Sequence, residues 1–207
     1  GTGNSAVCGT TVDVQDLIGP DCQAQDITAQ LDASGNVTID ATDIDNGSTD
    51  ACGIQSRAVN ITSFDCTDVG TPTIVQLTVT DNNGNTSICT ATVTVEDMVA
   101  PSCSTNDITV NLDGNGMVNI TAAMVDDNSF DACGIATRTV SPSSFACTEE
   151  GPNVVTLTVT DVNGCMDEAN AELVVNPTPV IDIDVVDPLC ILDDPVTLSA
   201  TPSGGTF

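Results

Sequence analysis

Residues 73–97, TIVQLTVTDNNGNTSICTATVTVED, have the pattern of a complete β-hairpin. The first half alternates polar residues with the apolar Val75, Leu77 and Val79, the period-two pattern of a strand with one buried face. The second half alternates in the same way. Between them, residues 81–85 (DNNGN) supply the Asp, Asn and Gly side chains that favour a tight turn. This stretch therefore predicts two antiparallel strands that pack one face against a core.

The same text returns at residues 153–176, NVVTLTVTDVNGCMDEANAELVVN. The period is 81 residues, and it separates the cysteine pairs Cys8 and Cys89, Cys22 and Cys103, Cys52 and Cys133, and Cys66 and Cys147. The two basic residues of the chain, Arg57 and Arg138, are also 81 residues apart. Self-similarity at a fixed period indicates tandem structural repeats. We expect each arginine to pair with a carboxylate of its own repeat; a ligand-binding arginine is the alternative.

The repeat divides the chain into four segments. Residues 1–18 correspond to the last strand of a preceding repeat, residues 19–98 and 99–177 are full repeats, and residues 178–207 begin a different β-domain with a strand at 180–186. Each repeat contains short alternating segments separated by turn residues, which predicts an antiparallel β-sandwich. We therefore expect an all-β chain of tandem sandwich domains in an extended rod, cut from a longer secreted protein.

Charge and composition exclude several function classes. The net charge is −28, with no lysine and no histidine. Such a chain has no cationic surface for nucleic acid or anionic lipid, and it contains no apolar run of about 18 residues that would insert into a membrane. Without histidine or lysine, Ser-His-Asp, Cys-His and Schiff-base catalysis are absent. Carboxylate pairs alone remain, without Trp or Tyr to stack a sugar. We predict no enzymatic activity.

Cysteine usage predicts disulfides. Domains of this size bury only about 60–65% of their unfolded surface and often need reinforcement, and the absence of a CxxC pair disfavours zinc. Disulfides place the protein in an oxidising, extracellular setting. In the first repeat three pairings are possible, of which we favour Cys22–Cys52 and Cys66–Cys89. The cysteines expected to be bonded are Cys22, Cys52, Cys66, Cys89, Cys103, Cys133, Cys147 and Cys165.

The second repeat departs from this cysteine pattern. Ala169 stands at the position of Cys89, and Cys165 lies four residues earlier. Four strand residues span about 13 Å, so a Cys147–Cys165 bond, reached by elimination, would need a local change. Cys8 and Cys190 are left to bond outside this chain.

Two acidic loops are candidate calcium sites. Residues 41–54 (ATDIDNGSTDACGI) and 122–135 (AAMVDDNSFDACGI) follow the second strand of each repeat. In a sandwich this loop, the last hairpin turn and the incoming chain share one pole. Calcium takes six to eight oxygen ligands, and the candidates at the two poles are Asp16, Asp43, Asp45, Asp50 and Asp81, and Glu96, Asp97, Asp126, Asp127, Asp131 and Asp161. The alternative is that these residues only form Asx turns and solvate the loops.

The motifs DIT, DACGI and LTVTDxNG resemble a known class of repeats. They are similar to the HYR and related immunoglobulin-like repeats of giant Bacteroidota cell-surface adhesins, and residues 163–165 and 176–181 resemble repeats of gliding-motility and attachment adhesins. The resemblance implies immunoglobulin-like sandwiches, export by the type IX route, a cell-surface location and a role as stalk or filament.

Three functions follow from these observations. The first is a structural segment of an extracellular adhesin or filament, whose partners are neighbouring repeats, further copies in a homo-oligomer or bundle, and a target cell surface or glycan reached through other regions. The second is a calcium-dependent glycan-binding module. The third is a spacer in a secreted enzyme. A glycan-binding module should expose its ion at a free pole, whereas a stalk should use ions to stiffen its joints.

Overall fold

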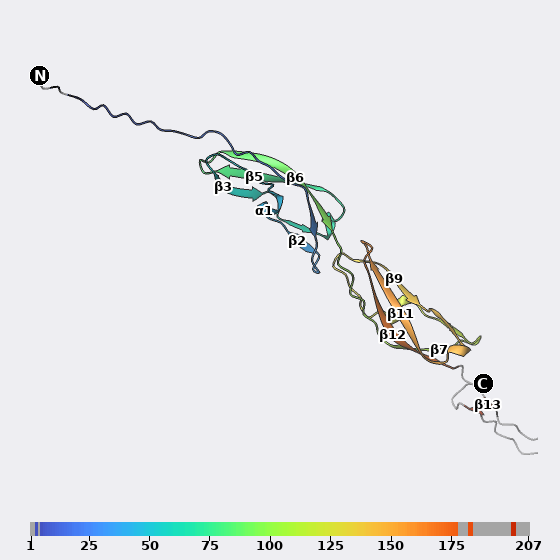
Figure 1. The fold of residues 1–207 in the computed structure, drawn as a ribbon. Helices are drawn as coiled ribbons and strands as arrows, with labels where there is room; N and C mark the ends of the chain where they lie inside the picture. The colour runs from blue at the N-terminus through green and yellow to red at the C-terminus, as the bar shows by residue number, and fades with distance from the viewer. Residues whose placement is uncertain (1–2, 4, 178–181, 184–199, 202–207) are drawn as a thin grey trace, which may run out of the picture. The chain divides into compact units, whose positions relative to one another are not determined.

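The computed structural model describes residues 3, 5–177, 182–183 and 200–201, and chain contacts divide it into unit 1, Gly1–Val99, and unit 2, Ala100–Phe207 (Figure 1). In unit 1 the elements are β1 (Ile27–Gln30), β2 (Asn36–Thr38), α1 (Ala41–Ile44), β3 (Ile54–Val59), β4 (Ser63–Asp65), the 3-10 helix η1 (Cys66–Asp68), β5 (Thr73–Asp81) and β6 (Thr86–Glu96). In unit 2 they are β7 (Ile108–Asn111), β8 (Met117–Asn119), α2 (Ala122–Val125), β9 (Ile135–Ser141), β10 (Ser144–Ala146), η2 (Cys147–Glu149), β11 (Gly151–Asp161) and β12 (Met166–Asn176).

The predicted hairpin forms the centre of unit 1. Strands β5 and β6 pair antiparallel from Thr73↔Val93 to Thr80↔Thr86, side by side in Figure 1. They belong to a four-stranded sheet of order β1-β6-β5-β3, and β2 and β4 form a separate two-stranded sheet. Unit 2 repeats this arrangement with a sheet of order β7-β12-β11-β9 and a β8-β10 pair. Each unit is thus an all-β sandwich of the immunoglobulin-like class, as the sequence predicted.

The alternation in the sequence becomes one buried face and one exposed face. Val75, Leu77 and Val79 of β5 are each 0% exposed, whereas Ile74 on the opposite face is 67% exposed. Across the core, Phe64 of β4 closes the two-stranded sheet onto this face and is buried. At about 25 cal/mol per Å² of apolar surface, such side chains supply most of the stabilisation of a small sandwich.

One pairing in each sheet is parallel, which corrects the purely antiparallel expectation. Strand β1 runs parallel to β6 with Ile27 opposite Val93, and β7 runs parallel to β12 with Ile108 opposite Leu173. Alternation reports which face of a strand is buried but carries no information on strand direction. A long connection separates β1 from β6 in sequence, so no tight turn forces them to be antiparallel.

The acidic loop after β2 begins with one helical turn, which the sequence did not predict. Asp40 caps α1 by accepting a hydrogen bond from Thr42 N at 2.7 Å, and Asp43 returns one by accepting from Asp40 N at 2.8 Å. This reciprocal pair satisfies backbone donors that a helix start leaves open. In unit 2 Thr121 takes the cap position of α2 and makes no side-chain cap bond.

Beyond residue 177 the structure describes only β13 (Asp182–Ile183) and β14 (Ala200–Thr201), which pair antiparallel. The rest of the strand predicted at 180–186, and Cys190, lie outside the described residues. Among the residues that are described, no helix has the length and apolar character needed to cross a membrane.

Candidate functional site

The candidate site is the end of unit 1 at which the chain enters the domain. We call it the proximal pole and define it by Asp16, Ile18, residues 49–52 and the turn at residues 81–85. The turn holds the incoming chain, because Asn85 Nδ2 lies 3.2 Å from Asp16 O and 3.3 Å from Ile18 O. Beside this contact lies an open pocket of about 480 Å³, lined by Asp16, Ile18, Gly19, Asp21, Thr49, Asp50, Ala51 and Cys52.

Three side chains converge in this pocket. Ligand atoms of Asp16, Asp50 and Cys52 all lie within 4.8 Å of one another. Asp50 Oδ1 also accepts the Cys52 N–H at 2.7 Å, which orders the loop. The Asp16 carboxylate accepts a hydrogen bond from the thiol, and together with its negative charge this raises the pKa of Cys52. The pole is therefore an acidic surface around a protonated thiol.

Asp43 and Asp45 were expected at this pole, but among the described residues they do not join the group. The incoming chain runs antiparallel to the acidic loop, with bridges Asp21↔Thr49 and Ala24↔Asp45. Asp45 therefore lies beside Ala24, eight residues along the chain from Asp16. Asp43 lies in the cap of α1. Both carboxylates have structural partners, so the acidic loop contributes Asp50 but not its whole charge.

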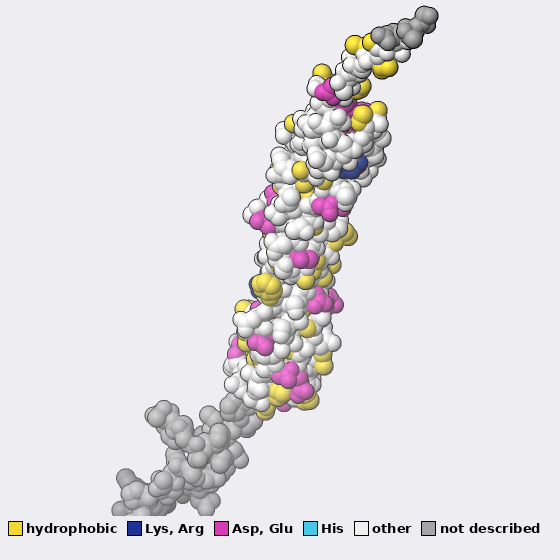
Figure 2. All heavy atoms as spheres, turned by 90° about the vertical axis from the view of Figure 1, so that its left-hand side faces the viewer, with side chains coloured by type: hydrophobic (Ala, Val, Ile, Leu, Met, Phe, Trp, Pro, Cys, Tyr) yellow, Lys and Arg dark blue, Asp and Glu magenta, His cyan; other side chains and the backbone are white. Residues whose placement is uncertain are grey.

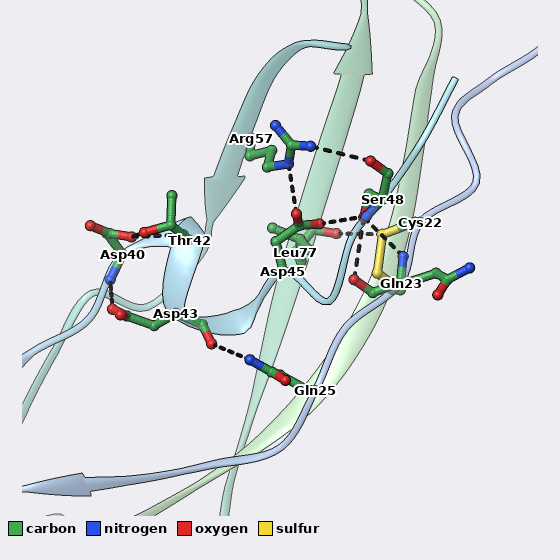
Figure 3. Close-up of polar contacts among 11 residues, drawn as sticks. Cys22, Gln23, Gln25, Asp40, Thr42, Asp43, Asp45, Ser48, Arg57 and Leu77 are labelled. Carbon is green, nitrogen blue, oxygen red and sulfur yellow. Dashed lines mark hydrogen bonds and ion pairs between the residues drawn. A yellow bond between two sulfur atoms is a disulfide. The ribbon is translucent and has the colours of Figure 1, made fainter. Parts of the chain in front are cut away.

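Asp45 belongs instead to a buried polar network around Arg57 (Figure 3). Arg57 Nε lies 3.0 Å from Asp45 Oδ2, and its Nη2 donates to Ser48 O at 3.2 Å. Ser48 Oγ in turn accepts from Gln23 N at 2.9 Å. Burial opposes ionisation of Asp45, but the hydrogen bonds from Ser48 and the charge of Arg57 prevail and lower its pKa. The predicted arginine–carboxylate pair is confirmed.

Unit 2 reproduces this network. Arg138 Nε lies 3.1 Å from Asp126 Oδ2, its Nη2 donates to Ser129 O at 3.0 Å, and Ser129 Oγ accepts from Ser104 N at 3.0 Å. Asp127 next to it is exposed. The two basic residues of the chain thus tie the same loop to the same strand in both repeats, which is a structural role.

The hairpin turn is organised by one buried carboxylate. Asp81 is 0% exposed and accepts from Asn83 N and Asn85 N at 2.8 Å each and from Asn85 Nδ2 at 2.7 Å. Burial would raise its pKa, but these hydrogen bonds, led by Asn85, lower it. Asp81 is therefore a satisfied turn residue and has little capacity left for an ion.

The equivalent turn of unit 2 lacks one of these donors. Asp161 is 1% exposed and accepts from Asn163 N and Cys165 N, but its Oδ2 has no hydrogen-bond partner. Cys165 stands where unit 1 has Asn85, so the side-chain amide that binds Asp81 is missing. The substitution leaves a buried oxygen unpaired at a cost of about 1–3 kcal/mol.

The remaining predicted ligands have partners of their own. Glu96 Oε2 accepts from Gln30 Nε2 at 2.8 Å, and Asp97 Oδ1 accepts from Val99 N at 3.0 Å. Asp131 is 8% exposed, and its Oδ1 accepts from Cys133 N and Gly134 N. Asp16, Asp50 and Cys52 correspond by the 81-residue period to Asp97, Asp131 and Cys133.

The disulfides differ from the favoured pairing. Cys22 bonds to Cys89, across 67 residues, and not to Cys52. The bond joins the incoming chain to the centre of β6, where Cys22 Sγ lies 3.7 Å from Leu77 O. Cys66 and Cys133 are also disulfide-bonded. Cys52, Cys103 and Cys147 are free thiols, so the expected Cys147–Cys165 bond is not formed.

Two features of the pole were missed by sequence reasoning. Cys52 was assigned to a disulfide, whereas it faces Asp16 as a free thiol. Asn85 was seen only as a turn residue, although it binds both Asp81 and the incoming backbone. An available signal was the exchange of Asn85 for a cysteine in the second repeat, because a purely turn-forming Asn is normally exchanged for another turn former.

Acidic side chains are distributed over the surface, not concentrated at the pole. Figure 2 shows them scattered singly over the visible face, with basic side chains at isolated points only. The net charge of −28 therefore acts as a diffuse load on the whole chain.

No protein-family model and no curated protein matches the chain. Similar solved structures include human mucin-like protocadherin EC1-2, at 16% identity and a TM-score of 0.33, covering 76% of this chain and 98% of that one. They also include protocadherin gamma B7 extracellular cadherin domains 1–4 (12%, 0.34, 86% and 56%) and the four N-terminal Ig domains of Dscam1 isoform 9.44 (10%, 0.33, 77% and 46%). Likenesses with TM-scores this low carry no argument about ligands or partners.

Proposed function

We propose that this chain is a structural repeat segment of a long extracellular adhesin or surface filament of the Bacteroidota type, without enzymatic activity. One observation carries the proposal: the arginine networks of the two units match contact by contact, Arg57–Asp45–Ser48 in one and Arg138–Asp126–Ser129 in the other. Polar groups repeated in this way hold loops onto sheets. The disulfide Cys22–Cys89 supports a protein that matures in an oxidising, extracellular setting.

Calcium at the proximal pole is part of this proposal. Asp16 and Asp50 supply hard carboxylate oxygens within a short distance of each other, as calcium requires. The fit is partial, because Cys52 is a poor ligand for calcium and the other carboxylates of the acidic loop are engaged. Water would complete the coordination shell. Such a site belongs to the weak class of extracellular modules, with a Kd of about 10⁻⁴–10⁻³ M.

The experiment compares thermal unfolding of the oxidised chain in millimolar calcium and in EGTA, with magnesium at equal ionic strength as a control. We expect calcium to raise the midpoint by mass action on the folded state. The double variant D16N/D50N should lose the response, whereas D13N, which removes an exposed carboxylate from the same incoming segment, should keep it. If wild type responds no more to calcium than to magnesium, the pole binds no calcium and its carboxylates only solvate the loop.

A calcium-dependent glycan-binding module is the second candidate, because the pocket beside Asp16 and Asp50 is open to solvent. A glycan array probed with calcium and with EGTA separates the two functions. Binding of any glycan only in the calcium arm, lost in D16N/D50N, would favour the module over the stalk.

A further inference from the structure

Two free thiols lie at positions where the other repeat carries a disulfide. Cys52 of unit 1 and Cys147 of unit 2 are exposed and free. The cysteines at the same places in the repeat are Cys133 and Cys66, and both are disulfide-bonded. The two kinds of position are therefore built to hold a disulfide, and this chain carries one unfilled example of each.

The two positions lie at opposite ends of a sandwich. Cys52 precedes β3, whose Ile54 pairs with Asp81 at the last residue of β5. The other kind of position comes just before the first residue of the equivalent strand: Cys147 starts η2, and Gly151 begins β11. The nine residues of β5 span about 26 Å. A disulfide needs its Cα atoms within about 7 Å, so the two kinds of cysteine cannot bond within one unit.

We propose that Cys52 of one copy of this chain forms a disulfide with Cys147 of a second copy, which joins the copies head to tail. Each copy offers one thiol of each kind at different sites, so the contact is heterologous and can be repeated into a linear chain. The other free thiols are of a different kind. Cys103 and Cys8 are the counterparts of Cys22 and Cys89, which form the bond internal to a unit.

The surroundings of both thiols suit a fixed cross-link. At Cys52 the backbone is held by its N–H bond to Asp50 and by Asn82 Nδ2, which donates to Cys52 O at 2.7 Å. The next residue, Gly53, has a φ of 93°, and a Cβ there would lie 2.7 Å from Asn82 Nδ2. Cys147 Sγ lies 3.5 Å from Gly116 O in the turn before β8. Each sulfur thus sits on an ordered turn and remains open to solvent.

The bond requires an oxidant, for which glutathione disulfide serves. One protein thiolate attacks it, forming a mixed disulfide and releasing one glutathione. The thiolate of the other copy then attacks the protein sulfur of this mixed disulfide, which forms the Cys52–Cys147 bond and releases the second glutathione. The two thiols lose two electrons and two protons, and glutathione disulfide receives them. No step depends on a bound cation, so the inference is independent of the calcium site.

The experiment oxidises the full chain with glutathione disulfide, in a C8S background that removes the exposed thiol of the amino-terminal segment, and resolves products on non-reducing gels. We expect a ladder of dimers and higher multimers that dithiothreitol collapses. C52S alone and C147S alone should remain monomeric, whereas an equal mixture of the two should stop at dimers, since only one pair of complementary thiols is present. Mass spectrometry should find the cross-linked peptide containing Cys52 and Cys147.

C103S is the matched control and should leave the ladder unchanged. Absence of multimers in the C8S chain would overturn the inference. Multimers from C52S or C147S alone, or a dimer cross-linked through any other pair of cysteines, would also overturn it. Far-ultraviolet circular dichroism of each variant verifies that the exposed Cys→Ser changes leave the sandwich folded.

Discussion

Arg57 Nε lies 3.0 Å from Asp45 Oδ2, and 81 residues later Arg138 Nε lies 3.1 Å from Asp126 Oδ2. The carboxylates are largely buried, with side chains 12% and 15% exposed, and each arginine also donates to a serine carbonyl of the same loop. A chain with a net charge of −28 thus uses its only two cations inside its domains, where each neutralises a buried carboxylate.

The first prediction concerns this pair. Arg57→Met should destabilise unit 1 by about 1–3 kcal/mol, because it leaves Asp45 buried without its cation and Ser48 O without a donor. Arg57→Lys should cost less, since an ammonium keeps the charge but reaches only one of the two acceptors. Urea unfolding measures both variants. Equal stabilities of R57M and wild type would mean that solvent fully replaces the pair.

The second prediction concerns pH. The pKa values of several carboxylates are lowered by hydrogen bonds to their own loops: Asp32, Asp40, Asp45, Asp65, Asp81, Asp113 and Glu149. In the unfolded chain these groups titrate near about pH 4. On acidification the unfolded state therefore binds protons first. Their stabilisation is complete above that pH and is lost as the pH falls through the folded values.

We accordingly expect the free energy of urea unfolding to fall between pH 5 and pH 3, over about the range in which carboxylates titrate. The variant D45N should be less stable at neutral pH and should show a shallower fall, because one of the titrating groups is gone. A stability that rises steadily down to the acid end would show that relief of repulsion among the acidic side chains outweighs the loss of these hydrogen bonds.

The third prediction restores a missing bridge in unit 2. Ala169 pairs with Leu157 as Cys89 pairs with Leu77, and Cys103 Sγ lies 3.5 Å from Leu157 O, as Cys22 Sγ lies by Leu77 O. Ala169→Cys should therefore bond to Cys103 and stabilise unit 2 by about 2–4 kcal/mol under oxidising conditions. Thiol counting verifies the bond, and thermal unfolding measures the gain. A169S is the control; a gain that persists in dithiothreitol would have another cause.

The fourth prediction concerns Asn85. Asn85→Ala should destabilise unit 1 by about 1–3 kcal/mol, because Asp81 Oδ2 is left buried without a donor and the carbonyls of Asp16 and Ile18 lose theirs. Amide hydrogen exchange at residues 16–18 should become faster as the incoming chain loosens. Asn83→Ala is the matched control, since its exposed side chain leaves the turn while its backbone N–H still binds Asp81. Equal effects of the two variants would contradict the role given to Asn85.

Much of the fold was predictable because it depends on local patterns. The alternation through Val75, Leu77 and Val79 predicted which face of β5 is buried, and the 81-residue period predicted that both units share one architecture. The arginine pairs were predictable for the same reason, since a chain with two cations at equivalent positions has few other uses for them. The turn at residues 81–85 followed from its Asp, Asn and Gly content.

The candidate site was predictable only in part. The sequence placed Asp16, Asp43, Asp45 and Asp50 together because all lie in or next to acidic loops, yet the antiparallel path of residues 21–24 along residues 45–49 separates Asp45 from Asp16. One residue along a strand moves a side chain by about 3.3 Å. A small difference in register therefore decides which carboxylates meet, and no local pattern encodes it.

The sequence by itself determined the class of the protein: an acidic, cysteine-containing β-repeat with alternating strands and tight turns. The tertiary structure alone decided that Cys22 bonds to Cys89, that β1 runs parallel to β6, and that Cys52 stays free beside Asp16. The reason is physical. Burial pattern and turn type are set by neighbours a few residues away, whereas a disulfide, a strand direction or a shared pole depends on where the folded path brings together residues far apart in sequence.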